Sequence, residues 1–267
     1  MNDETSRRVR DEFTRQAGQM AAAPAFRAQP VLERFIRAVG DSTSDRVLDV
    51  ACGPGIVAEA IAPHVGQVVG IDATPEMIRL ARERFGKAGL TNGRFELGSA
   101  EQLPFGNASF DQVVTRLSFH HLQEVPMALR EMRRLLRPGG RLTVADIISV
   151  EEGEQAALHN ALEQLRDPSH VRFFSQSGLL RLIQDAGFSV LHQDSWTQER
   201  SFDEWAAIVA DPARTQPLES VMRALARAGQ ACGISLHDDS GKLVFVHTWL
   251  MVIADSGWKD PTANEDP

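Results

Sequence analysis

The sequence predicts an α/β fold of the Rossmann-like, doubly wound type, with seven strands in a mostly parallel sheet whose last strand is antiparallel. Three observations indicate this fold. From residue 46 to residue 148, short apolar runs alternate with longer amphipathic stretches, as expected when helical crossovers join parallel strands. Helix signals separate these segments, with a start at Thr74-Pro75 and a stop at Pro138-Gly139-Gly140. After residue 150, helical stretches precede the strands.

Helices are expected to open the chain, because Val9, Phe13, Ala17 and Met20 recur at helical spacing and a second such set runs from Val31 to Val39. The chain length suits one domain. We expect that domain to cover residues 1–255, with N-terminal helices over 1–40, a first half over 41–150 and a second half over 151–255. A flexible tail over 256–267 follows, since that segment is rich in Asp, Pro and Asn.

The first half should contain five strands with helices between them. The expected strands are Val47–Ala51, Val68–Ile71, Arg94–Leu97, Phe110–Thr115 and Leu142–Ile148. The expected helices are Ile56–His64, Pro75–Ala88 and Pro126–Leu136.

The second half should contain a helical cap and the last two strands. Helices are expected at Glu152–Arg166 and Ser177–Ala186, and strands at Ser189–Gln198 and Lys242–Ala254. A helical insertion is expected between those strands, over residues 202–230.

Composition excludes several classes of protein. The 36 acidic residues outnumber the 28 basic ones, and a net charge of −8 argues against broad binding to nucleic acid or to an anionic membrane. Two cysteines make no disulfide framework, and the charged first residues do not resemble a signal peptide, so we expect a reduced, cytoplasmic setting. The His, Cys and Asp spacings match no metal site.

A glycine-rich turn is the strongest chemical signal. The strand ending in Asp49 runs into Gly53 and Gly55, whose missing Cβ atoms let the backbone turn sharply and approach a ligand. In open α/β sheets, ligands bind beyond the carboxyl ends of the strands, where this turn falls. Asp72 ends the next strand, and there a carboxylate can accept hydrogen bonds from both ribose hydroxyls. Because Thr74 is the better cap for the following helix, Asp72 should be free for a ligand.

The loop after the third strand, residues 98–105, could frame an adenine ring. The turn does not match the nicotinamide pattern G-x-G-x-x-G, because Ala51 stands at the first glycine position and the third glycine is missing. A ligand that contains adenosine without phosphates therefore suits the site better.

The order of four motifs resembles that of class I S-adenosylmethionine-dependent methyltransferases, in particular the ubiquinone/menaquinone-biosynthesis methyltransferase-like family. The motifs are Asp49-Val50-Ala51-Cys52-Gly53-Pro54-Gly55, Gly70-Ile71-Asp72-Ala73-Thr74-Pro75-Glu76-Met77, Ser99-Ala100-Glu101-Gln102-Leu103-Pro104-Phe105 and Leu135-Leu136-Arg137-Pro138-Gly139-Gly140. The resemblance implies that S-adenosyl-L-methionine is the cofactor, bound by the first half, and that the second half covers the substrate.

The resemblance also implies roles for residues. The cofactor's methionine part would lie at Asp49 and the turn of Ala51, Gly53 and Gly55. Its ribose would lie at Asp72 and Ala73, and its adenine against Met77, Ser99, Ala100 and Glu101. The segment from Arg116 to Ser118 would lie beneath the sulfonium.

Three positions depart from the family pattern. Ala51 replaces the usual first glycine, which is tolerable if that position is extended strand. Ser99 stands where relatives usually have Asp. Met20 stands where an N-terminal motif normally ends in Tyr, and it cannot donate the hydrogen bond of a tyrosine.

Two histidines, His120 and His121, follow the fourth strand, near the expected position of the methyl group. Methyl transfer is a direct displacement, so a general base is needed only when the acceptor atom must lose a proton. Each histidine is either that base or a packed structural residue. Because adjacent residues of an extended segment face opposite ways, at most one should reach the substrate, with His120 slightly favoured. His159 and His170 are expected to be exposed or capping, and His247 a surface or strand-face residue.

Met20, Phe26, Phe173, Phe174 and Trp196 are candidates to line a substrate pocket, although aromatic residues at such spacing more often belong to the core. We expect methyl transfer to an O, N or C atom of a small aromatic or heterocyclic metabolite, by a monomer or a homodimer. Two alternatives remain at this stage. One is a cofactor-assisted rearrangement or decarboxylation without methyl transfer, and the other is a non-catalytic S-adenosylmethionine-binding protein.

Overall fold

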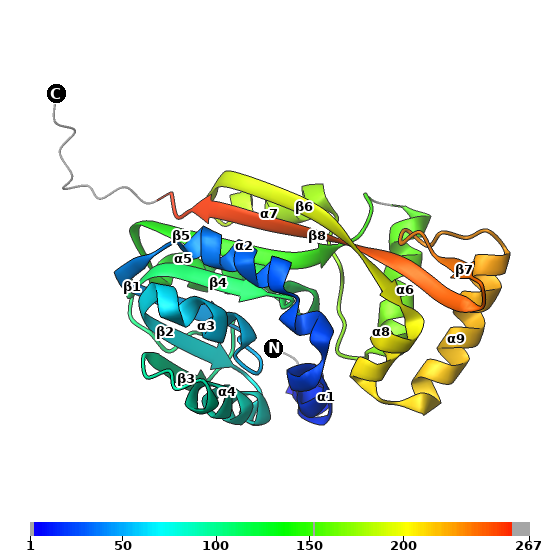
Figure 1. Ribbon diagram of the computed structural model, residues 1–267. Coiled ribbons are helices and arrows are strands. Elements are labelled where there is room, and N and C mark those ends of the chain that lie inside the picture. Colours follow the sequence, from blue (N-terminus) through cyan, green and yellow to red (C-terminus); the bar gives the residue numbers. More distant parts are fainter. Residues whose placement is uncertain (1–2, 152, 258–267) are drawn as a thin grey trace.

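The computed structural model describes residues 3–151 and 153–257, and Figure 1 shows them as one twisted sheet flanked by helices. The sheet order is β3-β2-β1-β4-β5-β8-β6, and a short strand, β7, pairs with β8 at its far end. The strands are β1 Ser42–Val50, β2 Val65–Asp72, β3 Gly93–Leu97, β4 Phe110–Arg116, β5 Leu136–Ile148, β6 Ser189–Ser201, β7 His237–Asp239 and β8 Lys242–Asp255.

The pairing confirms the predicted fold class. Strands β1 to β5 pair in parallel, whereas β8 runs antiparallel to both β5 and β6. The main path has the seven expected strands, and β7 is an addition that the sequence did not predict. The strand order reverses between β1 and β4, the position at which ligands bind in doubly wound sheets.

Helices cover both faces of the sheet. They are α1 Asp3–Ala22, α2 Gln29–Val39, α3 Ile56–Ile61, α4 Pro75–Lys87, α5 Val125–Leu135, α6 Glu154–Arg166, α7 Gln176–Asp185, α8 Phe202–Val209 and α9 Pro212–Arg227. Helices α2, α3 and α4 pack on one face, and α5 and α7 pack on the other. Neighbouring strand residues such as Val68 and Val69 belong to opposite cores, so the inner strands are buried on both sides.

The long strands β6 and β8 continue past the sheet toward α6, α8, α9 and β7, as Figure 1 shows. There a third apolar core forms, in which Trp205 of α8, Met222 of α9 and Phe245 of β8 are buried. This helical unit stands beside α1, which contacts α8. The position of the unit matches the cap expected from the sequence.

Several boundaries differ from the predicted ones. Strand β1 begins at Ser42, because its first residues pair with β2. The predicted insertion at 202–230 is two helices, interrupted where Ala210 adopts a left-handed backbone. The tail is not flexible at its start: Ser256 is buried, its N–H donates to Gly140 O, and its carbonyl accepts a hydrogen bond from Arg133. The rest of the predicted tail, 258–267, lies outside the described residues. Within the described ranges, no helix combines the length and apolar character needed to cross a bilayer.

Candidate active site

A cavity at the carboxyl ends of β1, β2 and β4 brings together most of the predicted cofactor residues; we call it the first cavity. The predicted residues that line it are Met20, Phe26, Asp49, Ala51, Gly53, Asp72, Ala73, Met77, Ser99, Ala100, Glu101, Arg116, Ser118 and His121. Gly55 does not line this cavity. It shapes the turn from behind, where a Cβ atom would meet the Ala81 Cβ at 3.0 Å and φ is +76°.

The turn after β1 is left-handed at Ala51 as well as at Gly53 and Gly55, with φ values of +53°, +52° and +76°. The expectation that Ala51 is extended is therefore wrong. An L-residue with a Cβ adopts this region at a cost of roughly 1–2 kcal/mol. A Cβ added at Gly53 would meet no atom within 4 Å, so the inner side of the turn is open.

Asp72 holds this turn in place. Its Oδ2 accepts a hydrogen bond from Gly53 N–H, and its Oδ1 accepts one from Thr74 N–H, both at 2.9 Å. The Thr74 side chain does not cap α4, in contrast to the sequence prediction. Asp72 therefore joins two loops and keeps only its remaining lone pairs for a ligand. Burial raises the pKa of this carboxyl.

Asp49 and Arg116 form the floor of the first cavity. Asp49 is 2% exposed and accepts a hydrogen bond from Ala58 N–H at 3.1 Å, and its burial raises its pKa to about 7. Burial lowers the pKa of Arg116 to about 10, and its Nη2 donates to Phe26 O at 2.9 Å. Each group favours the charged form of the other, so the two opposite charges stabilise each other inside the first cavity.

The loop after β3 is closed by its own side chains. The Ser99 hydroxyl donates to the Glu101 carboxylate, and Glu101 N–H lies 3.4 Å from Ser99 Oγ. Ser99 thus acts as a loop residue at the position where the family pattern has Asp. Met77 and Ala100, both buried, provide apolar walls beside this loop.

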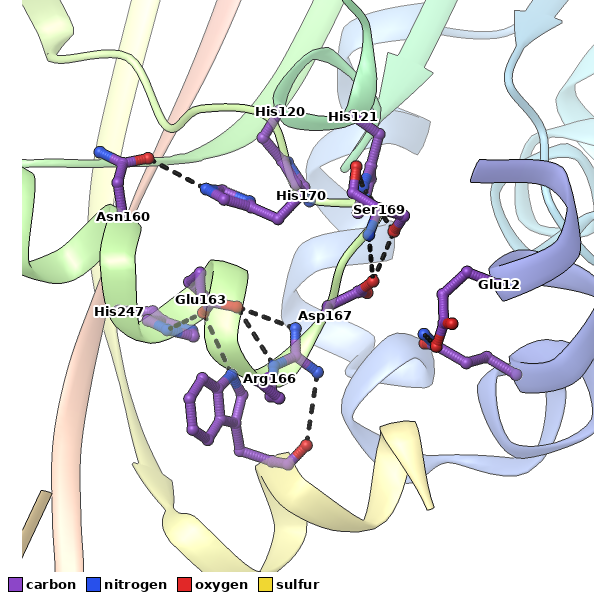
Figure 2. A network of polar contacts seen from close by, with 12 residues as sticks. Glu12, His120, His121, Asn160, Glu163, Arg166, Asp167, Ser169, His170 and His247 are labelled. Carbon is purple, nitrogen blue, oxygen red and sulfur yellow. Dashed lines mark hydrogen bonds and ion pairs between the residues drawn. The ribbon is translucent and has the colours of Figure 1, made fainter. Parts of the chain in front are cut away.

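His120 and His121 lie in a 3-10 helix, Phe119–His121, and not in an extended segment. The prediction that they face opposite ways is therefore wrong, since their ring centroids are 4.1 Å apart (Figure 2). His120 is buried, and its Nδ1 lies 2.5 Å from Asp146 Oδ1. Asp146 also accepts hydrogen bonds from the N–H groups of Phe119 and Ile147, so the carboxylate is fixed. Asp146 thereby orients the His120 ring, whose Nε2 lies on the side away from this carboxylate.

A second chain of hydrogen bonds orients His121. Its Nδ1 lies 3.1 Å from both Ser169 O and Ser169 Oγ, and the Ser169 hydroxyl donates to Asp167 Oδ1 at 2.6 Å (Figure 2). A carbonyl oxygen can only accept, so Nδ1 carries the proton and Nε2 is a bare acceptor. Burial lowers the pKa of His121 to about 4, which keeps the ring neutral at pH 7.

A second cavity adjoins the first, and the two share Phe13, Met20, Phe26, Leu117 and His121 as wall residues. We call it the second cavity. It reaches from the two histidines to the helical unit, and its other walls are Gln16, His120, Ile147, Glu163, Arg166, Asp167, Phe173, Arg200, Trp205, Ile208, His247 and Trp249.

Two predicted substrate residues lie outside both cavities. Trp196 stacks on Trp249 with ring centroids 5.6 Å apart, under the Arg34 guanidinium. Phe174 packs against the core beside α5 and α7. The local pattern could not show that Trp196 faces away from the cavity, because that depends on the pairing of β6 with β8.

The later histidines are not exposed, although His247 does lie on a face of strand β8, one of the two places expected for it. His159, His170 and His247 are all buried, with exposures of 1%, 6% and 3%. His159, Glu163 and His247 bring ligand-type atoms within 4.8 Å of one another, a grouping that sequence spacing did not reveal because β8 supplies one member. Figure 2 shows Glu163 between His247 and Arg166, and Arg166 donates a hydrogen bond to it.

The sequence analysis also missed the acidic partners of the two catalytic candidates, Asp146 and Asp167. Asp146 sits within an apolar run of β5, and a charged residue in an otherwise buried strand could have indicated it. Asp167 lies in the loop after α6, where nothing in the local pattern links it to His121.

Comparisons with known proteins show the family of this chain. Residues 48–144 match the family model described as a methyltransferase domain. The chain is 32% identical over 201 residues to the uncharacterized methyltransferase YcgJ of Bacillus subtilis, a match that covers 75% of this chain and 79% of that protein. The crystal structure of YcgJ has a TM-score of 0.78 at 28% identity and covers 84% of this chain and 97% of that one.

A demethylmenaquinone methyltransferase of Listeria welshimeri is 32% identical over 165 residues, which are 54% of this chain and 70% of that protein. The cyclase SpnF has a TM-score of 0.60 at 20% identity, over 85% of this chain and 79% of that one, and shares the fold alone.

The fold and these relatives define the protein as an enzyme, an S-adenosylmethionine-dependent methyltransferase, with S-adenosyl-L-methionine as its cofactor. Within that class, the chain belongs to the class I enzymes of the ubiquinone/menaquinone-biosynthesis methyltransferase-like family.

Proposed function

We propose that this enzyme methylates an O, N or C atom of a small aromatic or heterocyclic metabolite that binds in the second cavity. The observation that carries the proposal is the junction of the two cavities at His121. The second cavity is lined by the rings of Phe13, Phe26, Phe173 and Trp249, which suit a flat apolar molecule.

The residues of the first cavity fit the cofactor. Asp72 has lone pairs for two ribose hydroxyls, the open side of Gly53 admits a chain close to the backbone, and Met77 provides an apolar wall for a ring. Asp49 offers its carboxylate to an ammonium group. When bound, S-adenosylmethionine supplies an electrophilic methyl group on a sulfonium sulfur. The family assignments for Ala51, Gly55, Ala73, Ser99, Ala100, Glu101, Arg116 and Ser118 are part of the same proposal.

We assign different tasks to the two histidines. His121 Nε2 is a neutral acceptor at the junction of the cavities, where it can hold or take the proton of an acceptor hydroxyl or amine. His120 lines only the second cavity, and Asp146 fixes its ring, so it supports the same position from behind. Where the acceptor is carbon without an acidic proton, both would act by positioning alone.

We also infer a reducing, cytoplasmic setting, because Cys52 and Cys232 are both free and buried. A substrate of low molecular weight fits the enclosed shape of the second cavity. Whether the enzyme is a monomer or a homodimer stays a prediction.

A metabolite screen with methyl-labelled cofactor tests the proposal. We expect label to appear in an aromatic or heterocyclic product together with S-adenosylhomocysteine. The transfer should depend on His121, whereas His192, an exposed histidine on β6, is a matched control for substitution by Gln. Product formed without label transfer would favour a rearrangement or decarboxylation. Label found only in nucleic acid or protein would contradict the substrate class.

A further inference from the structure

The second cavity contains buried hydrogen-bond donors that lack acceptors. Arg200 Nη2 and Trp249 Nε1 make no hydrogen bond within the described part of the chain, and His247 beside them has a 3.3 Å contact from Nε2 to Glu163 Oε1. These side chains are 8%, 4% and 3% exposed, and all three line the second cavity. Leaving a buried donor unpaired is costly, so such groups call for an explanation, which a missing ligand would supply.

Strand geometry explains why these donors gather at one place. His247 and Trp249 are two residues apart on β8, so they share a face of the sheet. Arg200 of β6 lies directly opposite Phe245 of β8, and Phe245 precedes His247 by two residues on that same face. The donors therefore form one patch on the cavity wall.

The acidic residues of the cavity do not satisfy these donors. Glu163 Oε2 accepts hydrogen bonds from Arg166, and Glu163 Oε1 accepts one from Trp205 Nε1 at 3.1 Å. His247 Nε2 lies 3.3 Å from the same Oε1, so this histidine already faces a carboxylate (Figure 2). Asp167 Oδ1 accepts two hydrogen bonds from Ser169. The Arg200 guanidinium thus keeps a free charge in a buried place, and burial lowers its pKa.

We propose that the second cavity binds its substrate through an anionic group, a carboxylate or a phosphate, held by Arg200 and Trp249. This assignment rests on the proposed function, because it places the anion at one end of the molecule that is methylated near His121. A guanidinium can hold such a group through two parallel hydrogen bonds, and the indole N–H supplies a further donor. The substrate class becomes an aromatic or heterocyclic acid.

The same cavity disfavours a metal ion. The group of His159, Glu163 and His247 could offer three ligands, but Arg166 and Trp205 already bond to both oxygens of the carboxylate. The guanidinium groups of Arg166 and Arg200 also lie along this cavity and repel a cation. Arg166 and Arg200 balance the charges of Glu163 and Asp167 along this cavity, so an anion would be held by the unpaired donors of Arg200 and Trp249 and not by a net charge.

Binding of matched small probes tests the proposal. Calorimetry would compare benzoate, phenyl phosphate and benzamide, with S-adenosylhomocysteine present and absent. We expect at least one anion to bind about tenfold more tightly than neutral benzamide, the ratio for a hydrogen bond to a charged group. Tighter benzoate indicates a carboxylate substrate, and tighter phenyl phosphate indicates a phosphate. Equal affinity for the three probes, or binding of none, would overturn the proposal.

Variants locate the effect. Arg200→Gln should remove the preference for the anion, whereas Arg200→Lys, which keeps the charge, should retain part of it and guards against a folding defect. Arg172→Gln is the matched control, because Arg172 is exposed and lies outside the second cavity. A preference that survives Arg200→Gln would refute the assignment. The assignment would also be refuted if zinc bound tightly to the wild type and His159→Asn abolished this binding, since a cation would then bind beside the second cavity.

Cofactor binding separates this proposal from the proposed function. S-adenosylmethionine should bind equally to wild type and Arg200→Gln, because Arg200 lies outside the first cavity. If the labelled methyl group is found only on neutral acceptors and the probes show no preference for anions, the proposed anion site is wrong and the proposed methyl transfer is retained. If anions bind at Arg200 but no small molecule is methylated, the proposed function fails by itself.

Discussion

Asp72 has two tasks at once, and the substitution Asp72→Asn separates them. Its two oxygens accept hydrogen bonds from Gly53 N–H and Thr74 N–H, both at 2.9 Å. The amide that replaces the carboxylate has one oxygen and one NH₂ group, so one of the two backbone donors loses its acceptor and faces another donor. The negative charge that strengthens both bonds also disappears.

The expected size follows from these contacts. Loss of one hydrogen bond to a charged group costs about 1.5–3 kcal/mol, so the free energy of unfolding should fall by about that amount. If the ribose hydroxyls donate to the same carboxylate, cofactor affinity should fall by a further 1.5–3 kcal/mol, roughly 10- to 150-fold. This loss of affinity should be larger than the loss caused by the unfolded fraction of the variant, because the folded molecules also carry the altered site.

Calorimetry with S-adenosylmethionine and urea unfolding would measure the two effects on the same samples. Glu76→Gln is the matched control, because Glu76 makes its ion pair with Arg79 on α4 and lies outside the first cavity. An Asp72→Asn protein that is less stable but binds the cofactor with unchanged affinity would refute the ribose assignment. Unchanged stability would refute the view that this carboxylate holds the turn.

Three further predictions follow from the site. If the acceptor atom carries a proton, His121→Gln should lower kcat by about 10²–10⁴-fold in a labelled-methyl assay. Wild-type activity should fall below about pH 5 as the His121 ring is protonated. An equal loss of activity in the variant at every pH would indicate that His121 only positions the substrate. Acid should destabilise the protein, because burial holds the pKa values of His121, His159 and His170 at about 4, 3 and 3, below the usual 6.5. The contribution of these neutral histidines to the free energy of unfolding is complete above pH 6.5 and is lost as pH falls toward 4, by about 1 kcal/mol for each histidine between pH 7 and 5.5. The raised pKa of Asp49 offsets part of this loss. Urea unfolding that gives the same free energy over this pH range would contradict the expected sign. Gly55→Ala should cost about 1–2 kcal/mol of stability, because the backbone at this position is left-handed and an added Cβ would lie 3.0 Å from the Ala81 Cβ of α4. Thermal unfolding measures this cost, and an unchanged Tm would show that the turn adapts.

The geometry of the two histidines differs from the predicted one, although both line the cavities of the candidate site. His120 and His121 were expected on an extended segment, which would turn one ring away. Instead, a single 3-10 turn places both rings on the same side, because the chain bends sharply after β4 and Asp146 accepts the Phe119 N–H at the start of the turn. A carboxylate on the neighbouring strand thus decides the local backbone, which a local pattern cannot show.

The sequence by itself determined the fold class, the approximate positions of the strands in the first half and most of the residues around the first cavity. These features are local: Asp49, Gly53 and Asp72 sit at the ends of strands or in the turn that follows, and parallel strands bring such ends to one edge. Periodicity and turn chemistry within a short window are therefore sufficient to place them.

Only the tertiary structure decided the second cavity. Arg200 meets His247 and Trp249 because β6 and β8 pair antiparallel in one particular register, and a shift by one residue would turn each side chain to the other face. Asp167 reaches His121 through Ser169 only because the loop after α6 returns to the turn of the two histidines, where Val171 N–H donates to His120 O. Contacts between distant segments depend on register and packing, so the residues that select the substrate became visible only when those segments were brought together in the fold.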